Sequence, residues 1–310
     1  MVVPAVFKFV NWITGTPVPI DDAITSALTP TVDSALSTAL SNFIFGIVRE
    51  RLLANRDYYV ATTGSDSNNG LTPATPFLTL QKAMNVSSSL DLGVFNVTNN
   101  VADGTYTAGV DIKPWVGSGT IFFKGNVTTP ANVKITVTGD DCFANNAGSL
   151  SGTFDISGFQ LKTITSGFCI LSRLPGRIQY TKIVFDTAPV AHVVSAFGSL
   201  IVGYGANEII GSTIIHGLAD TNGVIAWPAT DVAAVVYTIT GAPNFNVAFV
   251  QSGNAGAVSA TGFSFVGAGA TGKRYVVNVG SIIQTNGGGA NYFPGNIAGT
   301  ADAATFSVYA

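Results

Sequence analysis

Charge is scarce in this sequence of 310 residues: only 10% are Asp, Glu, Lys or Arg, whereas ordinary soluble domains contain about 25%. A surface with so few charges, rich instead in Ser, Thr, Asn and Gly, suggests that much of it is buried against other subunits. The net charge is −3, and only 14 residues are Lys or Arg. Because nucleic-acid binding depends on clustered basic side chains, we do not expect nucleic acid as the main partner.

Long apolar runs are also missing, although the mean hydropathy is positive, at +0.41. A bilayer span needs about 20 consecutive apolar residues. The stretch 43–48 is too short, and the stretch 224–239 is interrupted by Pro228 and Asp231. We therefore expect no membrane insertion.

The chain contains only two cysteines, Cys142 and Cys169, and only two histidines, His192 and His216. The members of each pair are 27 (169 − 142) and 24 (216 − 192) residues apart. Such intervals are typical of a solenoid with coils of roughly 22–30 residues, in which residues one coil apart stack on each other.

Three interpretations of the two cysteines stay open. We favour a reduced ladder in the core, because free cysteine is among the most buried residue types. Stacking would also bring the thiols near disulfide range in an oxidising environment. A metal site is disfavoured because no His or Cys partners follow at ligand spacing, and we expect neither a metal nor another cofactor.

The most informative segment that is present covers residues 58–84. Residues 58–60 are strand formers, and 64–70 form a dense run of turn residues with two glycines. Thr79 can then cap a short helix that runs to about residue 85. Its apolar face is expected to hold Leu80, Ala83 and Met84.

From residue 86 to about 283 the sequence alternates between short β-forming stretches and Gly, Asn, Asp or Pro. No helical period of useful length occurs in this region, which predicts an all-β architecture. Predicted strands are 93–98, 120–124, 133–137, 154–161, 178–185, 209–215 and 232–239.

Several motifs resemble those of a known family. The segment 58–84 resembles the entry to the β-helix of pectate-lyase-like proteins and bacteriophage or prophage tailspikes, and 103–106 and 121–130 resemble its early coils. The stretch 283–296, with its Asn-Tyr-Phe-Pro-Gly-Asn turn, resembles the C-terminal signature of phage spike-type proteins. The resemblance implies an all-β, right-handed, single-stranded parallel β-helix with an N-terminal helical anchoring segment.

Three regions follow from this comparison. Residues 1–57 are interpreted as a virion-anchoring segment, with a helix predicted between 30 and 53 from apolar residues at intervals of three and four. Residues 58–283 are the predicted β-helix with an N-terminal cap. Residues 284–310 are the predicted glycine-rich loop and trimerising tail.

The resemblance also implies a function. We expect a virion spike or fibre protein, a homotrimer on the exterior of the tail or head that is made in the host cytoplasm. Its partners would be other virion proteins, through residues 1–57, and a bacterial surface polysaccharide. The alternatives are a polysaccharide depolymerase, a purely structural head or tail fibre, and a bacterial adhesin. An adhesin is disfavoured because the apolar stretch around Lys8 is interrupted by Pro17 and Pro19, unlike an export signal.

The sequence leaves catalysis open, but the small number of carboxylates argues against it. Glycoside hydrolysis needs two carboxylates about 5–10 Å apart, and the candidates are Asp186, Glu208 and Asp220. Their intervals of 22 (208 − 186) and 12 (220 − 208) residues would place the first two on adjacent coils. The alternative is that these acids serve as turn residues.

A lyase would need a base and cationic groups. Arg173, Arg177 and Lys182 precede Asp186 and His192 and make this the best neighbourhood for such chemistry. A solvated loop around residues 175–176 explains the same charges more simply.

Aromatic side chains in the middle coils could bind a glycan by stacking on sugar rings. The candidates are Tyr204, Trp227 and Tyr237, of which Trp227, before Pro228, is expected to be the most exposed. Packing in the core is the competing interpretation of all three.

Overall fold

The computed structural model describes residues 8–10, 17–19, 49–228 and 235–310. The chain divides into two compact units, Met1–Glu50 and Arg51–Ala310. In the first unit, β1 (Lys8–Val10) pairs antiparallel with β2 (Pro17–Pro19). The predicted helix between 30 and 53 lies, up to residue 48, outside the described residues.

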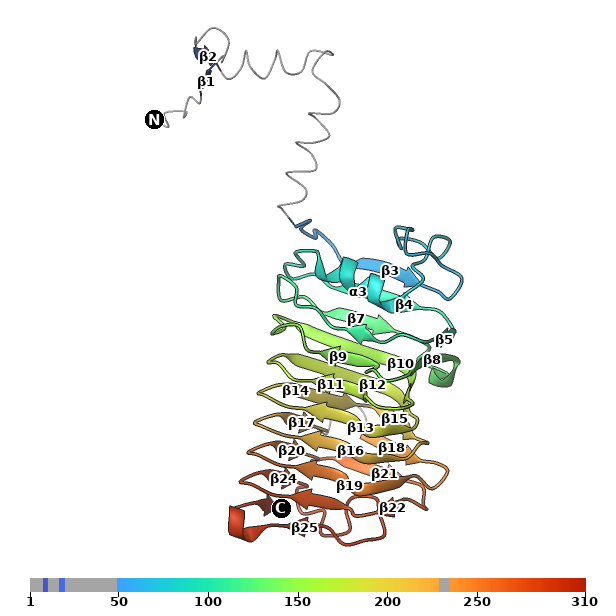
Figure 1. The fold of residues 1–310 in the computed structure, drawn as a ribbon, viewed down its shortest axis with the longest axis vertical. Coiled ribbons are helices and arrows are strands. Elements are labelled where there is room, and N and C mark those ends of the chain that lie inside the picture. The colour runs from blue at the N-terminus through green and yellow to red at the C-terminus, as the bar shows by residue number, and fades with distance from the viewer. Residues whose placement is uncertain (1–7, 11–16, 20–48, 229–234) are drawn as a thin grey trace. The chain divides into compact units, whose positions relative to one another are not determined.

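The second unit is a parallel β-solenoid of about eight turns, in which successive coils stack on one another (Figure 1). Its strands form three ladders, and every pairing within them is parallel. The first ladder contains β3 (Arg56–Val60), β4 (Val97–Val101), β7 (Ile121–Lys124), β10 (Thr153–Thr163), β12 (Arg177–Phe185), β14 (Leu200–Tyr204), β17 (Val224–Ala226), β20 (Ala257–Ser259), β24 (Ile282–Gln284) and β26 (Val308–Tyr309).

The second ladder shares the long strands β10 and β12 with the first, and the third forms a separate sheet. The second ladder adds β5 (Gly104–Tyr106), β8 (Val133–Val137), β15 (Ala206–Ile209), β18 (Val235–Ile239) and β21 (Phe263–Val266). The third contains β6 (Val110–Asp111), β9 (Phe143–Asn145), β11 (Phe168–Ser172), β13 (Ala188–Ser195), β16 (Thr213–Ala219), β19 (Asn244–Ser252), β22 (Thr271–Gly272), β23 (Tyr275–Val277) and β25 (Thr300–Ala301). Two short 3-10 turns, η1 (Pro130–Asn132) and η2 (Ala303–Thr305), lie between the strands.

The register gives the coil length directly. Phe154 pairs with Ile178, which pairs with Ile201, so these coils contain 24 and 23 residues (178 − 154 and 201 − 178). In the third ladder, Ala191 pairs with Ile215 and Val193 with Gly217, which places the intervening histidines opposite each other. The predicted stacking one coil apart is confirmed.

The core consists of side chains that point inward from alternate strand positions. One inward column of the first ladder is entirely apolar, and each member is at most 1% exposed. Burial of each such side chain stabilises the fold by about 1.5–3 kcal/mol. The column contains Ile121, Phe154, Ile178, Ile201, Ile225, Val258 and Ile283.

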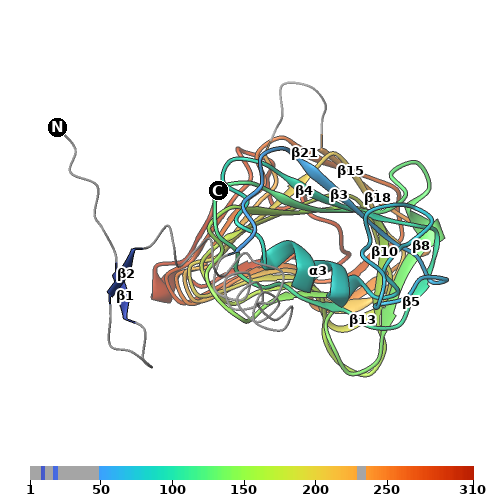
Figure 2. The same ribbon diagram turned by 90° about the horizontal axis from the view of Figure 1, so that it is seen from above.

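A short helix, α3 (Leu80–Ser88), lies across one end of the solenoid, as the view along its length shows (Figure 2). The Thr79 side chain accepts a hydrogen bond from the Lys82 backbone N–H at 3.1 Å, which caps the helix. The predicted apolar face is confirmed, because Leu80, Ala83 and Met84 are buried against the first coils. The helix covers apolar side chains that would otherwise face solvent.

The glycine-rich loop after β24 plugs the other end of the core. Phe293 is 1% exposed and packs against Phe249 and Phe265. The Tyr292 hydroxyl lies 2.7 Å from the carbonyl oxygens of both Ala260 and Phe263 and shares its one proton between them. Beyond the loop, β25 and β26 continue the third and first ladders.

Three predicted elements are wrong in part. The strand predicted over 93–98 begins only at Val97, with β4, and residues 93–94 form a turn. The helix predicted to reach residue 53 does not do so: Leu52 is 1% exposed and its N–H donates to the Asp91 carbonyl, so the chain already joins the solenoid there. The strand predicted over 209–215 is broken at a corner. A Cβ on Gly211 would lie 2.0 Å from the Thr187 nitrogen, a close approach that only glycine permits.

Candidate functional site

Asp186 and Glu208 lie on successive coils and on the same outer side of the second ladder. β12 pairs with β15 so that Val184 faces Glu208 and Phe185 faces Ile209. Asp186 is therefore one rung and two residues away from Glu208, which corresponds to about 8 Å between their Cα atoms. The predicted placement of these two acids on adjacent coils is confirmed.

Both carboxylates accept hydrogen bonds from neighbouring side chains. Asp186 Oδ2 accepts from Gln160 Nε2 at 2.8 Å and lies 3.7 Å from Lys162 Nζ. Glu208 Oε1 accepts from Thr240 Oγ1 at 2.7 Å. Since Lys162 is 40% exposed, its ion pair contributes little stability.

Asp220 lies elsewhere, in the corner after β16 of the third ladder. It accepts hydrogen bonds from Asn254 Nδ2 at 2.7 Å and Thr221 Oγ1 at 3.1 Å. An interval of 12 residues is about half a coil, so Asp220 is carried to another face than Asp186 and Glu208. Its contacts are those of a turn aspartate.

The cationic neighbourhood considered for a lyase does not converge on one point. The Arg173 guanidinium lies over the Phe168 ring, 5.5 Å from its centroid, while Arg177 donates to Tyr204. Lys182 is exposed and His192 is fully buried. These residues cannot act on one substrate atom in this arrangement.

Trp227 and Tyr237 are fully buried, so neither ring can stack on a sugar, and the competing interpretation of core packing fits them. Trp227 Nε1 donates to the Tyr180 hydroxyl at 2.7 Å, and that hydroxyl is also hydrogen-bonded to Tyr237. Two glycines make room for the indole. A Cβ at Gly203 would lie 2.7 Å from the Trp227 ring, and one at Gly217 would lie 2.9 Å from it.

The two histidines form a buried pair inside the same coils. His192 Nε2 lies 2.8 Å from the Asp186 carbonyl oxygen, which can only accept, so the His192 proton is on Nε2. His192 Nδ1 then accepts from His216 Nδ1–H at 2.9 Å. This leaves a lone pair on His216 Nε2, buried and without a hydrogen-bond partner among the described residues.

Burial keeps both imidazoles neutral. It lowers the pKa of His192 to about 4, and it lowers that of His216 well below the usual range, with a further contribution from His192. The rings lie among aromatic neighbours such as Phe185 and Phe249. The pair is therefore part of the core. The interval between His192 and His216 predicted that they stack, but nothing in the sequence predicted that both rings are buried.

Tyr204 is the one predicted glycan-binding aromatic that lies at the surface, half-buried on the outer side of the first ladder. Arg177 Nη2 donates to its hydroxyl at 2.8 Å. Gln179, with its amide oxygen turned toward the guanidinium, accepts from the same Nη2 at 2.7 Å. We call Arg177, Gln179 and Tyr204, with Asp155, the Tyr204 cluster.

Asp155 faces Gln179 across one rung of the first ladder. Burial raises the pKa of its carboxyl to about 6, which is close to the value that suits a general acid or base near neutral pH. Asp155 was not selected as a site residue from the sequence. Its position between the inward-facing Phe154 and Ile156 indicates that it points outward, but the degree of its burial depends on neighbouring coils.

Both cysteine thiols are free and buried. Cys142 Sγ lies 3.4 Å from the Lys162 carbonyl oxygen and Cys169 Sγ lies 3.6 Å from that of Leu161. Burial raises the pKa of Cys169 well above its usual range, with a further contribution from Cys142. Of the three interpretations, the structure has the reduced core ladder.

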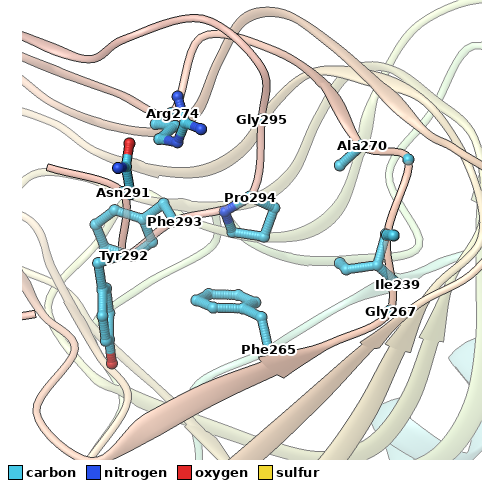
Figure 3. A pocket seen from close by; sticks show the side chains of 12 residues that line it. Ile239, Phe265, Gly267, Ala270, Arg274, Asn291, Tyr292, Phe293, Pro294 and Gly295 are labelled. Carbon is cyan, nitrogen blue, oxygen red and sulfur yellow. The ribbon is translucent and has the colours of Figure 1, made fainter.

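A cavity of about 320 Å³ opens near the C-terminal end of the solenoid. Arg274 and Asn291 lie on one side of it and Phe265 and Ile239 on the other, with Pro294 between them (Figure 3). We call this cavity the Arg274 pocket. It was missed in the sequence because its walls come from segments as far apart as β18 and the loop after β24.

No group of three or more His, Cys, Asp or Glu side chains among the described residues could hold a metal ion. In the same part of the chain, no helix is both long and apolar enough to cross a membrane. Comparison with protein-family models, with curated proteins and with solved structures gives no match.

Proposed function

We propose that this protein is a subunit of a virion spike or fibre that attaches a bacteriophage to a bacterial surface glycan. In this proposal the solenoid is a right-handed β-helix of the pectate-lyase-like type, and the first unit binds other virion proteins. The protein would be made in the host cytoplasm and placed on the exterior of the tail or head. The observation that carries the proposal is the Tyr204 cluster.

The Tyr204 cluster combines the groups that sugar recognition needs. A half-exposed aromatic ring offers an apolar surface, and a guanidinium and an amide beside it offer hydrogen bonds to hydroxyl groups. All of them project from β12 and β14, so the ladder holds them in fixed positions. A rigid, shallow, polar surface of this kind suits a long chain-like ligand better than a small one.

The test is retention of the purified protein on a panel of capsular polysaccharides and lipopolysaccharides. Tyr204→Ala is expected to reduce retention at least about tenfold, which corresponds to about 1.4 kcal/mol. Tyr59→Ala, at a partly exposed tyrosine of the distant strand β3, is the matched control and should leave retention unchanged. Equal retention of both variants, or none by the unmodified protein, contradicts the proposal.

A homotrimer is part of this proposal. One outward column of the first ladder is apolar over five successive rungs and carries no charge, although an open parallel sheet is normally covered on both faces. Val224→Lys, on the second rung of this column, is expected to convert a trimer into monomers in light scattering, with the β-sheet circular dichroism unchanged. The column contains Leu200, Val224, Ala257, Ile282 and Val308.

The anchoring role of the first unit is tested by deletion. The deletion should end at residue 50 and not at residue 57, because the second unit begins at Arg51. Removing residues 1–57 would also remove Leu52 and the start of β3 from the solenoid. Removing residues 1–50 is expected to leave a folded solenoid that no longer joins particles. Loss of folding in the shorter deletion would contradict the anchoring role.

The second candidate function is a depolymerase, because Asp186 and Glu208 lie on successive coils, about 8 Å apart at their Cα atoms, and glycoside hydrolysis uses a pair of carboxylates. New reducing ends, or unsaturated uronate absorbance, would appear when the protein meets host polysaccharide. Cleavage that disappears in Asp186→Asn but persists in Asp220→Asn would replace adhesion by hydrolysis as the main function. A structural fibre would neither bind nor cleave.

A further inference from the structure

The Arg274 pocket contains a cation without a counter-charge. Arg274 follows β22, and no carboxylate among the described residues forms an ion pair with it. Its Nε is buried and has no hydrogen-bond partner in the part of the chain that the structure describes. A buried donor left unpaired costs about 1–3 kcal/mol, so the guanidinium is incompletely paired. Arg274 also lines the cavity, where its guanidinium can donate to a group that binds there (Figure 3).

The pocket is preformed by backbone contacts. Gly272 N–H donates to Asn296 Oδ1 at 2.9 Å, and the Gly272 carbonyl accepts from the Asn296 and Ile297 nitrogens. Gly295 adopts φ +134°, and a Cβ there would meet the Arg274 stem at 3.3 Å. The loop is thus fixed directly against Arg274, which lowers the entropy cost of binding.

The rest of the wall is apolar or neutral. Phe265 and Pro294 offer flat surfaces opposite the guanidinium, and Asn291 lies on its side of the rim (Figure 3). Arg274 is the single charged residue among those that line the cavity. The cavity volume is at the lower end of the range for ligand pockets, which suits one ring rather than a long chain.

We propose that the Arg274 pocket binds a carboxylate-bearing sugar ring, that is, an acidic residue of the glycan. This inference deepens the proposed function and rests on it for the source of the ligand. The carboxylate accepts hydrogen bonds from the Arg274 guanidinium, a planar donor that matches carboxylate geometry. The apolar face of the sugar ring lies against Phe265 and Pro294, and a hydroxyl bonds Asn291.

The test measures binding of glucuronate, glucose and acetate to the full-length protein by calorimetry at low ionic strength, where the charge interaction is least screened. Glucuronate is expected to bind at least about tenfold more tightly than glucose, which lacks only the carboxylate. Acetate that binds as tightly as glucuronate would show a carboxylate site without a sugar subsite and would overturn the proposal.

Two variants assign the binding to the pocket. Arg274→Gln is expected to lower glucuronate affinity about tenfold, whereas Lys273→Gln, which removes the same charge from the adjacent residue outside the cavity lining, should leave it unchanged. Asn291→Ala, at an exposed loop position, should weaken binding without affecting folding if Arg274→Gln proves unstable. Unchanged affinity in Asn291→Ala and in a folded Arg274→Gln overturns the proposal.

Failure of this inference is distinguishable from failure of the proposed function. Retention on neutral polysaccharides that depends on Tyr204 but not on Arg274 would preserve adhesion and reject the acidic-sugar pocket. Saturable glucuronate binding lost in Arg274→Gln, together with no retention on any polysaccharide, would preserve the pocket and reject adhesion.

Discussion

The early and middle coils of the solenoid have cores of different composition. In the early coils, Phe123, Phe143 and Phe154 contact one another with ring centroids 5.4–6.0 Å apart. In the middle coils, aromatic rings carry hydrogen-bonding groups, as in the Trp227–Tyr180 and His192–His216 pairs. The same ladder geometry therefore accommodates a core of phenylalanines and a core of hydrogen-bonded aromatic rings. We expect only the stability of the hydrogen-bonded core to depend on protonation and on every polar group having a partner.

The largest expected effect concerns the early coils. Phe154→Ala removes a fully buried ring and should lower the free energy of unfolding by about 3–5 kcal/mol. The loss should be the same at pH 7 and pH 5, because the rings that pack against Phe154, those of Phe123 and Phe143, do not titrate. Denaturant unfolding at both pH values measures it. A loss that depends on pH would break the distinction between the two regions.

Acid should weaken the middle coils first. The pKa of His192 is about 4 in the folded protein and 6.5 in the unfolded chain, so between these values the unfolded chain binds more protons. The contribution is fully present above about pH 6.5 and is lost as the pH falls toward 4, by about 3 kcal/mol.

Hydrogen exchange, corrected for intrinsic rates, locates this effect. Amides of β13 and β16 should lose protection on acidification before those of β7 and β10 do. Equal loss in both sets of strands would show that the histidine pair does not set the acid sensitivity.

A smaller effect is expected from Tyr180→Phe. It leaves the Trp227 N–H and the Tyr237 hydroxyl without their shared partner inside the core and should cost about 2 kcal/mol. Tyr58→Phe is the matched control, since Tyr58 is also buried but sits in the early coils against Phe77. Urea unfolding of both variants at pH 7 compares them, and equal costs would refute the dependence on pairing.

The smallest expected effect comes from Asp155→Asn on the outer side. Burial raises the pKa of this carboxyl to about 6, so at pH 7 the folded protein carries a poorly solvated charge that the amide removes. We expect a gain of about 1 kcal/mol at pH 7, since the group is partly exposed.

The gain disappears on acidification, because protonation of Asp155 removes the same charge. Because the folded protein binds the Asp155 proton more tightly than the unfolded chain, this group stabilises the fold as the pH falls from about 6 toward 4. It therefore opposes the histidine effect. Asp155→Asn should make the stability fall more steeply with acid in the same unfolding series, and a shallower fall would contradict the raised pKa.

The sequence predicted what depends on coil length and missed what depends on neighbouring coils. The interval between His192 and His216 predicted their stacking. Thr79, a residue type that favours the N-cap position, predicted the start of the cap helix. The burial of Trp227 could not be predicted, because the space for it is made by Gly203 and Gly217 on other strands. The Arg274 pocket could not be predicted from the sequence either, because its lining residues come from segments that are far apart in the chain.

Parallel stacking also has a mechanical consequence. The hydrogen bonds between coils run along the axis of the solenoid, so a pull on its two ends loads one rung at a time instead of all rungs together. From β4 onward, the coils contain between 23 (201 − 178) and 33 (258 − 225) residues, so each detached coil would release about 80–110 Å of chain. Stretching a single molecule should therefore produce a series of low force peaks whose spacing follows the lengths of the coils, and the solenoid would lengthen gradually before it failed.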